Sequence, residues 1–134
     1  MAERAAVVDT HALLYHAAGG RRLGSQAAAH FAAASEGRAL VYVPMAVAIE
    51  LILLDRLGRA GFRVTAAEFF ETLLLNPAFQ LIDLTIDQVV AASGLRFNRD
   101  PYDAMIVAAA RSLDLPLITR DSAIVESGAV KVMW

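Results

Sequence analysis

Residues 5–14 read AAVVDTHALL, an apolar run that ends abruptly at the carboxylate of Asp9. Ala5 to Val8 is short and rich in valine, as expected of a buried strand, and the residues from Thr10 onward favour a helix. A strand followed directly by a helix is the repeating unit of a parallel sheet. The rest of the chain repeats this alternation, so the segment sets the pattern of the fold.

Further strands and helices can be placed by their apolar runs and by the residues that bound them. We predict strands at 39–43, 79–84, 115–119 and 129–133, helices at 10–18, 25–36, 44–57, 66–75, 86–93 and 101–113, and a helical turn at 122–126. Pro44 suits the first position of its helix, and Thr65 with Glu68 forms a capping box. The alternation predicts a three-layer α/β/α fold with a central parallel sheet of four to five short strands. Residues 1–134 read as a single domain without a linker or repeat.

The composition is strongly aliphatic. Apolar residues make up 57% of the 134 residues, whereas aromatic residues make up only 7%. Such a chain has either a large core or an apolar surface that a partner covers. No stretch reaches the roughly 18 uncharged apolar residues of a membrane span, and no signal peptide precedes Asp9. Without cysteine there is no disulfide framework and no thiolate metal site, so we expect a cytoplasmic protein that does not enter the membrane.

The formal net charge of −2 argues against a globally basic nucleic-acid binder. Any contact with nucleic acid must therefore be local and must come mainly from arginine, because Lys131 is the only lysine. Most arginines are expected on a solvated face. The candidates for local contacts are Arg21, Arg22, Arg56, Arg59, Arg63, Arg96, Arg99 and Arg120.

Four acidic residues lie within or beside apolar stretches, where a charge is costly unless it is compensated. They are Asp9, Glu50, Asp103 and Asp121. In open parallel sheets, sites form outside the carboxyl ends of the strands. Asp9 directly follows the first predicted strand, and Asp121 lies two residues beyond the fourth. If these two strands are neighbours, the two carboxylates meet.

Each of these acids also has a structural alternative. Asp9 and Asp121 can cap the helices that follow them, and the helix dipole favours Asp103 in a first helical turn. Glu50 can form a buried ion pair with an arginine. Asp100 precedes Pro101 and is best explained as a helix cap, in a supporting role. The four acids lie on separate elements near one end of the sheet, which favours a common site.

A cluster of carboxylates without a basic partner nearby in sequence indicates a divalent-metal site. Oxygen ligands favour Mg²⁺ or Mn²⁺ over zinc, and His11, His16 and His30 lack ligand spacing to one another. Such a site suits in-line displacement at phosphorus. The chain offers no competing nucleophile elbow or P-loop.

Four segments together resemble the PIN-domain ribonucleases, and more closely the VapC-type toxins of bacterial type II toxin–antitoxin modules. They are VVDTHALLY at 7–15, Ile49-Glu50, NRDPYDAMIVAAA at 98–110 and LPLITRDSAI at 115–124. Their order and spacing fit across nearly the whole chain. The resemblance implies an Mg²⁺- or Mn²⁺-dependent endoribonuclease with its acidic site at Asp9, Glu50, Asp103 and Asp121, supported by Thr119 and Asp100. Such toxins usually form homodimers. A cognate antitoxin silences them by docking in an apolar groove, and it often blocks the acidic pocket with a basic side chain.

Two positions depart from the family pattern. Asn98 stands where many relatives have His, and Ala104 follows Asp103 where Arg is frequent. Neither change removes a metal ligand, but the second one affects either a contact to RNA or packing. For phosphate contacts we predict Arg21 and Arg22 in a glycine-bounded loop, with Arg96 and Arg99 near the acidic site.

A partner surface is indicated independently of the resemblance. Residues 45–57 are apolar almost all round, which predicts burial of that helix on more than one side. The apolar content continues through Phe62, Phe69, Phe70 and residues 73–75. Either the two helices pack together within the monomer, or part of their surface binds an antitoxin or a second subunit.

Rival functions fit less well. A response-regulator receiver needs paired acids near its first strand and a lysine at a late strand end. A haloacid-dehalogenase-type phosphatase needs a second aspartate two positions after the first, where this chain has His11. A catalytically silent Mg²⁺-binding interaction domain is the remaining alternative.

Overall fold

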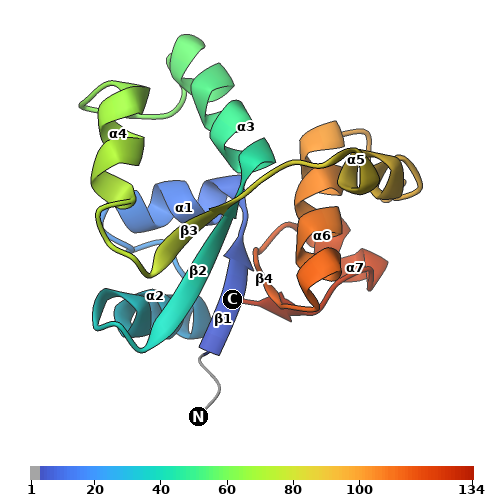
Figure 1. Cartoon of the computed structure of the whole chain (residues 1–134), viewed down its shortest axis with the longest axis horizontal. Coiled ribbons are helices and arrows are strands. Elements are labelled where there is room, and N and C mark those ends of the chain that lie inside the picture. Colours follow the sequence, from blue (N-terminus) through green and yellow to red (C-terminus); the bar gives the residue numbers. More distant parts are fainter. Residues whose placement is uncertain (1–3) are drawn as a thin grey trace.

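A computed structural model describes residues 4–134. The strands are β1 (Arg4–Val8), β2 (Ala39–Pro44), β3 (Phe79–Ile82), β4 (Leu117–Ile118) and β5 (Val132–Met133). The helices are α1 (Thr10–Ala17), α2 (Ser25–Ser35), α3 (Met45–Arg56), α4 (Ala66–Leu73), α5 (Ile86–Ser93), α6 (Pro101–Leu113) and α7 (Ser122–Ser127). Helices and strands alternate as predicted, and the described elements form one α/β domain (Figure 1).

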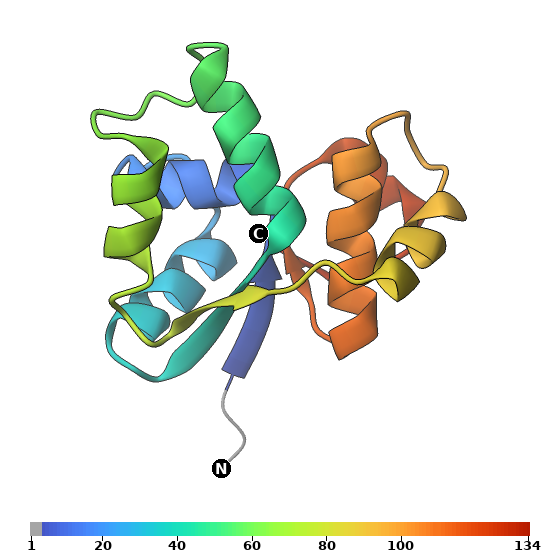
Figure 2. The same ribbon diagram turned by 45° about the horizontal axis from the view of Figure 1, so that its top comes forward.

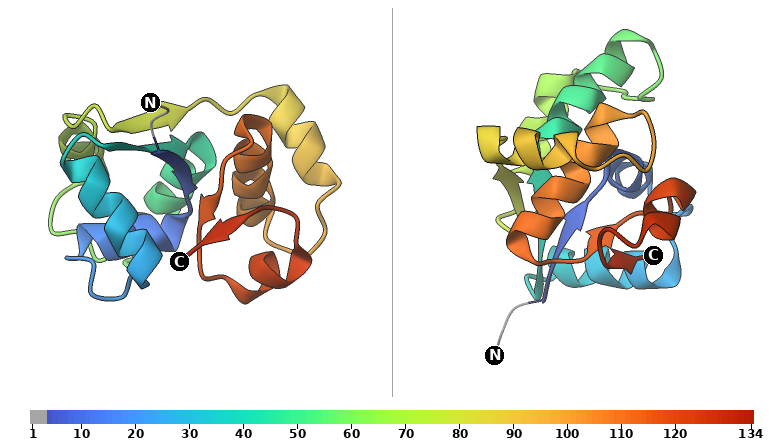
Figure 3. Two further views of the ribbon diagram at one scale, coloured as in Figure 1. Left: turned by 90° about the horizontal axis from the view of Figure 1, so that it is seen from below. Right: turned by 90° about the vertical axis from the view of Figure 1, so that its right-hand side faces the viewer.

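The strands form one sheet in the order β3-β2-β1-β4-β5, and every neighbouring pair is parallel. The strand β1 lies at the centre, between β2 and β4. Helices cover both faces: α1 and α2 lie on one side of β1, whereas α5 and α6 lie on the other (Figure 3). This arrangement confirms the predicted three-layer fold with a parallel central sheet.

The core follows from the position of β1. Ala6, Val7 and Val8 are fully buried, because a central parallel strand has helices on both faces. Side chains from the neighbouring strands continue this core, among them Val41, Val43, Leu117 and Ile118. The apolar run before Asp9 therefore has the burial that the sequence predicted.

Several predicted strands were too long, and the predicted start of one helix was displaced. The strands β4 and β5 contain two residues each, where the sequence suggested five. The extended backbone nevertheless continues past β4, since the N–H of Thr119 donates to the carbonyl of Met133 at 3.2 Å. Pro44 is the N-cap of α3, not its first helical residue, because its ψ of 144° is extended. Within residues 4–134, none of the helices combines the length and the apolar character that a membrane crossing requires.

Candidate active site

The carboxyl ends of β1 and β4 bring together two acids from opposite ends of the chain. Val8 pairs with Ile118, and the N–H of Asp9 extends this ladder by donating to the carbonyl of Ile118 at 3.2 Å. The predicted neighbourhood of these two strands is therefore correct. Burial is the main cause of the raised pKa of Asp9, and the nearby charge of Asp121 adds to the rise.

Two helices add further carboxylates. The helices α3 and α6 stand on either side of the carboxyl end of β1 (Figure 2). Glu50 lies in the middle of α3 and accepts a hydrogen bond from the hydroxyl of Thr10. Asp103 lies in the first turn of α6, and its Oδ2 accepts a hydrogen bond of 2.8 Å from the side-chain amide of Asn98.

Three of the acids also cap helices. Oδ1 of Asp9 accepts from the N–H of Ala12 at 2.8 Å, and Oδ1 of Asp121 accepts from the N–H of Ile124 at 3.1 Å. Oδ1 of Asp100 caps α6 through the N–H of Tyr102 at 2.8 Å. A carboxylate has two oxygens with about four lone-pair sites, so one capping bond does not use up the capacity of an acid to bind a ligand. Capping and ligand binding are therefore compatible.

The alternative proposed for Glu50 does not hold. Among the residues described here, the only ion pair joins Arg38 to Glu36 on the surface. Glu50 is thus not neutralised by an arginine, although it is half-buried in an apolar helix. The hydroxyl of Thr10 is its hydrogen-bond donor, and no cationic side chain pairs with it among the described residues.

One cavity of about 300 Å³ collects these acids. Five carboxylates line it: Asp9, Glu50, Asp100, Asp103 and Asp121. The remaining lining comes from Thr10, His11, Ala12, Tyr15, Arg120 and Trp134. Thr119 does not line the cavity. It is fully buried behind it, where its hydroxyl accepts a hydrogen bond of 3.1 Å from the N–H of Asp121.

The pKa values of three of these groups are raised, mainly by burial and further by neighbouring negative charge. Burial, followed by repulsion from Asp100, Asp121 and Glu50, raises the pKa of Asp103 to about 7, although the Asn98 amide opposes this rise. Burial is also the main cause of the raised pKa values of Asp9 and Glu50. A bound cation would relieve this cost.

The donor set fits a hard divalent cation by its chemistry, because oxygen ligands predominate at Mg²⁺ and Mn²⁺ sites. Throughout residues 4–134, no three acidic or histidine side chains already stand in a geometry that could hold a metal ion. Each carboxylate is instead held by a nearby donor, as described above. Side-chain rotation would have to bring the carboxylates onto a common ion.

None of the four arginines predicted to contact phosphate lines this cavity. Arg21, Arg96 and Arg99 are exposed on the surface, while Arg22 lies with its guanidinium carbon 4.6 Å from the centre of the Tyr15 ring. The arginine that lines the cavity is Arg120.

Sequence reasoning placed Arg120 only among the eight broad candidates. It did not identify Tyr15 or Trp134. The position of Arg120 directly before the predicted site residue Asp121 was the signal that could have identified it.

Ala104, the second departure from the family pattern, has a structural role. Its side chain is buried beside Ala92 and Ala108, where α5 packs against α6. A small residue at this position lets the two helices approach closely. The change therefore concerns packing, and Asp103 beside it keeps its place in the cavity.

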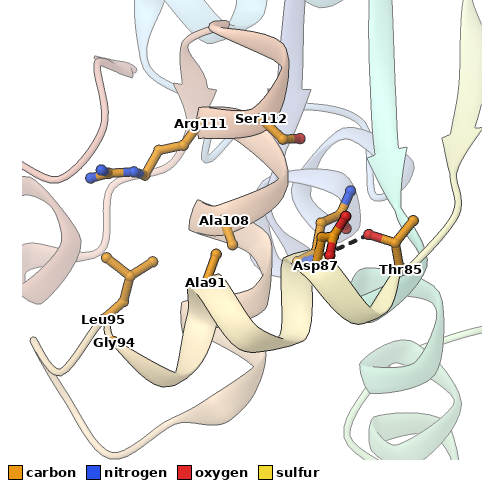
Figure 4. A pocket seen from close by; sticks show the side chains of 9 residues that line it. Thr85, Asp87, Ala91, Gly94, Leu95, Ala108, Arg111 and Ser112 are labelled. Atoms are coloured by element: carbon orange, nitrogen blue, oxygen red, sulfur yellow. Dashed lines mark hydrogen bonds between the residues drawn. The ribbon is translucent and has the colours of Figure 1, made fainter.

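A larger cavity of about 630 Å³ lies between α5 and α6 but contains no comparable cluster (Figure 4). Its charged side chains are Asp87 and Arg111. The guanidinium of Arg111 donates a hydrogen bond of 2.8 Å to the carbonyl of Ala129, and Thr85 caps α5 through the N–H of Gln88 at 3.2 Å. The convergence of acids therefore identifies the smaller cavity as the candidate site.

Solved structures share this fold over nearly their whole length. A toxin–antitoxin complex from Klebsiella pneumoniae is 21% identical, with 95% of this chain and 94% of that chain covered and a TM-score of 0.61. VapBC2 from Rickettsia felis, bound to a promoter DNA fragment, is 12% identical, with 96% of both chains covered and a TM-score of 0.67. DNA-bound VapBC from Salmonella typhimurium is 14% identical, with 98% and 97% covered and a TM-score of 0.67.

At these identities the likeness shows a common fold. A comparison with curated proteins found no match. The family profile of the PIN domain matches residues 6–128, nearly the whole chain. The chain therefore belongs to the PIN domain family, as its motifs predicted.

Proposed function

We propose that this protein is a metal-dependent endoribonuclease that acts as the toxin of a toxin–antitoxin pair. The observation that supports it best is the set of five carboxylates around one cavity, none of them in an ion pair within the described residues. An uncompensated group of this kind is costly unless it serves a ligand. Membership of the PIN domain family is consistent with a nuclease.

Asp9 and Asp121 would hold the cation from the sheet, Glu50 from α3, and Asp103 from α6. A divalent cation at this position would orient the attacking water and neutralise charge on the phosphorus oxygens. Thr119 would support Asp121 through the hydrogen bond to its N–H, and Asp100 would fix the start of α6. Mg²⁺ is the expected ion, and Mn²⁺ is expected to substitute for it.

The toxin role is supported by the structures that share the fold, whose names describe toxin–antitoxin complexes. The resemblance of the four sequence segments to VapC-type toxins favours RNA as the substrate. It also favours a homodimer and inhibition by a cognate antitoxin.

Exposed apolar residues on α3, in the α3–α4 connection and directly after α4 are available to such a partner. They are Ile49, Ile52, Leu53, Leu57, Val64, Leu74 and Leu75, and we refer to them as the α3/α4 surface. Leu57 is 58% exposed and Leu75 is 82% exposed. Contiguous exposed apolar patches mark interaction sites more often than single exposed residues do. We propose that this surface binds the antitoxin or a second subunit.

The competing proposal is a catalytically silent Mg²⁺-binding interaction domain. A receiver-like version of it needs a lysine at the acidic pocket. Lys131, the only lysine, lies instead beside Asp114 and Val130, outside the candidate site. The endoribonuclease and the catalytically silent domain differ in whether the protein cleaves RNA.

The deciding experiment is cleavage of single-stranded RNA by the purified protein in Mn²⁺ or Mg²⁺. Asp9→Asn and Asp103→Asn are expected to lower the rate by about a hundredfold or more, since they remove charge from the metal site. Asp55→Asn, which changes an exposed acid on α3, is the matched control. Cleavage that survives both site substitutions unchanged would contradict the proposal.

Size-exclusion chromatography tests the proposed surface separately. The free protein is expected to elute as a species larger than a monomer or to aggregate, and Ile52→Lys with Leu53→Lys is expected to relieve this. A wild-type protein that stays monomeric and soluble, with no tendency to aggregate, would count against the surface.

A further inference from the structure

The cavity that holds the acids also carries a separate basic wall. Arg120, Tyr15 and Trp134 line it together with the five carboxylates. Arg120 immediately precedes Asp121, so its side chain begins next to a concentration of negative charge. The structure nevertheless shows no ion pair between Arg120 and any of these acids, among the residues that it describes.

The aromatic residues hold the guanidinium away from the acids. An Nη2 atom of Arg120 donates a hydrogen bond of 2.8 Å to the hydroxyl of Tyr15. The guanidinium carbon lies 5.0 Å from the centre of the Tyr15 ring and 5.9 Å from that of Trp134, within the range of cation–π attraction. The two rings stand edge to face, with centres 6.2 Å apart.

The backbone fixes Trp134 in turn. Its carbonyl accepts hydrogen bonds from the N–H groups of Gln26 at 2.9 Å and Ala27 at 3.4 Å, at the start of α2. A Cβ atom on Gly24 would lie only 2.5 Å from both the carbonyl carbon and the ring of Trp134. The absence of a side chain at Gly24 thus allows this close approach.

A cavity with both carboxylates and an unpaired guanidinium suits a metal ion together with a phosphate group. The carboxylates would bind the metal cation, and the guanidinium would bind the phosphate anion. A guanidinium has five N–H donors in a planar fork that matches phosphate. The bond to Tyr15 occupies part of that fork, and Arg120 is exposed on the cavity side. A carboxylate that formed an ion pair with Arg120 would no longer be free to bind a metal ion.

We propose that Arg120 binds a backbone phosphate of the single-stranded RNA, with Tyr15 and Trp134 as positioning residues that keep its guanidinium off the carboxylates. This inference rests on the proposed function, because it takes RNA as the ligand. It names the side chain by which the strand is held next to the acids.

Binding of a fluorescein-labelled oligouridylate, measured by fluorescence anisotropy at several salt concentrations, tests the role of Arg120. All proteins in this measurement, including the parent, carry Asp103→Asn so that the RNA is not cut. Arg120→Gln is expected to weaken binding about tenfold and to reduce the slope of log K against log salt by about 0.7, the value for one phosphate contact on a single strand. Arg120→Lys should restore the slope but only part of the affinity, because it keeps the charge but not the fork. Arg4→Gln, at an exposed arginine outside the cavity that is not among the candidates for nucleic-acid contacts, is the control.

Tyr15→Phe tests the positioning role, since it keeps the ring and removes only the acceptor for Arg120. It is expected to weaken binding less than Arg120→Gln while leaving the salt slope unchanged. In addition, Trp134 is the only tryptophan, so its emission should change when the oligonucleotide binds. A salt slope in Arg120→Gln equal to that of the parent protein would overturn the proposal, as would an equal loss in Arg4→Gln.

The anisotropy measurement does not depend on cleavage. If the wild type cuts no RNA and the Arg120 variant still loses one phosphate contact, then the nuclease proposal fails and the phosphate site stands. If the wild type cuts RNA and Arg120→Gln binds it normally, the phosphate site fails and the nuclease proposal stands.

Discussion

The side-chain amide of Asn98 donates a hydrogen bond of 2.8 Å to Oδ2 of Asp103 and, through its own Oδ1, accepts one of 3.0 Å from the N–H of Asp100. Asn98 therefore links the cap of α6 to the carboxylate in its first turn. The residue that departs from the family pattern at this position orients Asp103 in the cavity.

Asn98→Ala should weaken metal binding. A hydrogen bond to a charged group contributes about 1.5–3 kcal/mol, which corresponds to about tenfold or more in an equilibrium constant. Its loss also raises the pKa of Asp103 further, since the Asn98 amide holds it down. The measurement is the Mn²⁺ concentration that gives half of the maximal thermal stabilisation. Asn98→His, which keeps a donor, should behave more like the wild type, and equal midpoints for Asn98→Ala and wild type would show that the bond is dispensable.

Saturating Mn²⁺ should raise the melting temperature of the wild type, because a ligand that binds only the native state stabilises it. At a hundred times Kd the gain is about 2.7 kcal/mol, which corresponds to about 10 °C for a chain of this size. Differential scanning fluorimetry measures the shift. Asp9→Asn and Asp103→Asn should lose most of it, whereas Asp55→Asn should keep it. An unchanged wild-type melting temperature would mean that the carboxylates do not assemble around an ion.

Without metal, the protein should become less stable as pH rises from about 4 to about 7. The carboxyl of Asp103 has an ordinary pKa of 3.8 in the unfolded chain, and in the folded protein its pKa is about 7. Between these values the native state binds more protons than the unfolded state, so the free energy of unfolding falls with increasing pH. The raised pKa values of Asp9 and Glu50 act in the same direction.

Urea unfolding at a series of pH values, with a chelator present to remove metal ions, measures how the free energy of unfolding depends on pH. Asp103→Asn should flatten the curve in part, and Asp55→Asn should not. Stability that increases with pH over this window would contradict the assignment.

Gly24→Ala should displace Trp134. The added Cβ would meet backbone atoms of Trp134 at 2.5 Å, so one of the two segments must move. Such overpacking typically costs about 1–3 kcal/mol. Trp134 emission reports the displacement directly, and RNA binding should weaken with it. Gly94→Ala is the control, since its Cβ would meet only the carbonyl of Ala91 at an ordinary 3.6 Å. Equal effects of the two substitutions would exclude a specific role of Gly24.

The sequence was sufficient for the fold because local patterns and packing agree. Valine-rich runs, glycine stops and the Asp100-Pro101 cap each predicted the element that is found. Apolar segments buried on both faces also indicated a parallel sheet. The edge strand β5 was overestimated, since apolar residues of the preceding loop, such as Ala129 and Val130, pack against the core without joining the ladder.

The acidic side of the cavity was predictable because strand ends of a parallel sheet meet at one edge. The position of Arg120 in the cavity was not predictable from the sequence. Tyr15 and Arg120 meet only through the β1–β4 pairing, and nothing near either residue in the sequence indicates the other. The predicted burial of α3 holds for only one side of the helix within the monomer. Ala46, Val47 and Leu51 are buried. In contrast, Ile49, Ile52 and Leu53 are each more than 40% exposed. An apolar helix does not reveal which of its sides the monomer covers.

The central position of β1 has a consequence for synthesis on the ribosome. Asp9 is translated early, but its neighbour Asp121 follows β4, which is translated near the other end of the described chain. A nascent chain therefore lacks the complete acidic cavity until β4 has left the exit tunnel. The α3/α4 surface, built from residues 49–75, is translated well before that point. Under the proposed toxin role, an antitoxin that recognises this surface would have an interval in which to bind before the acidic cavity is complete.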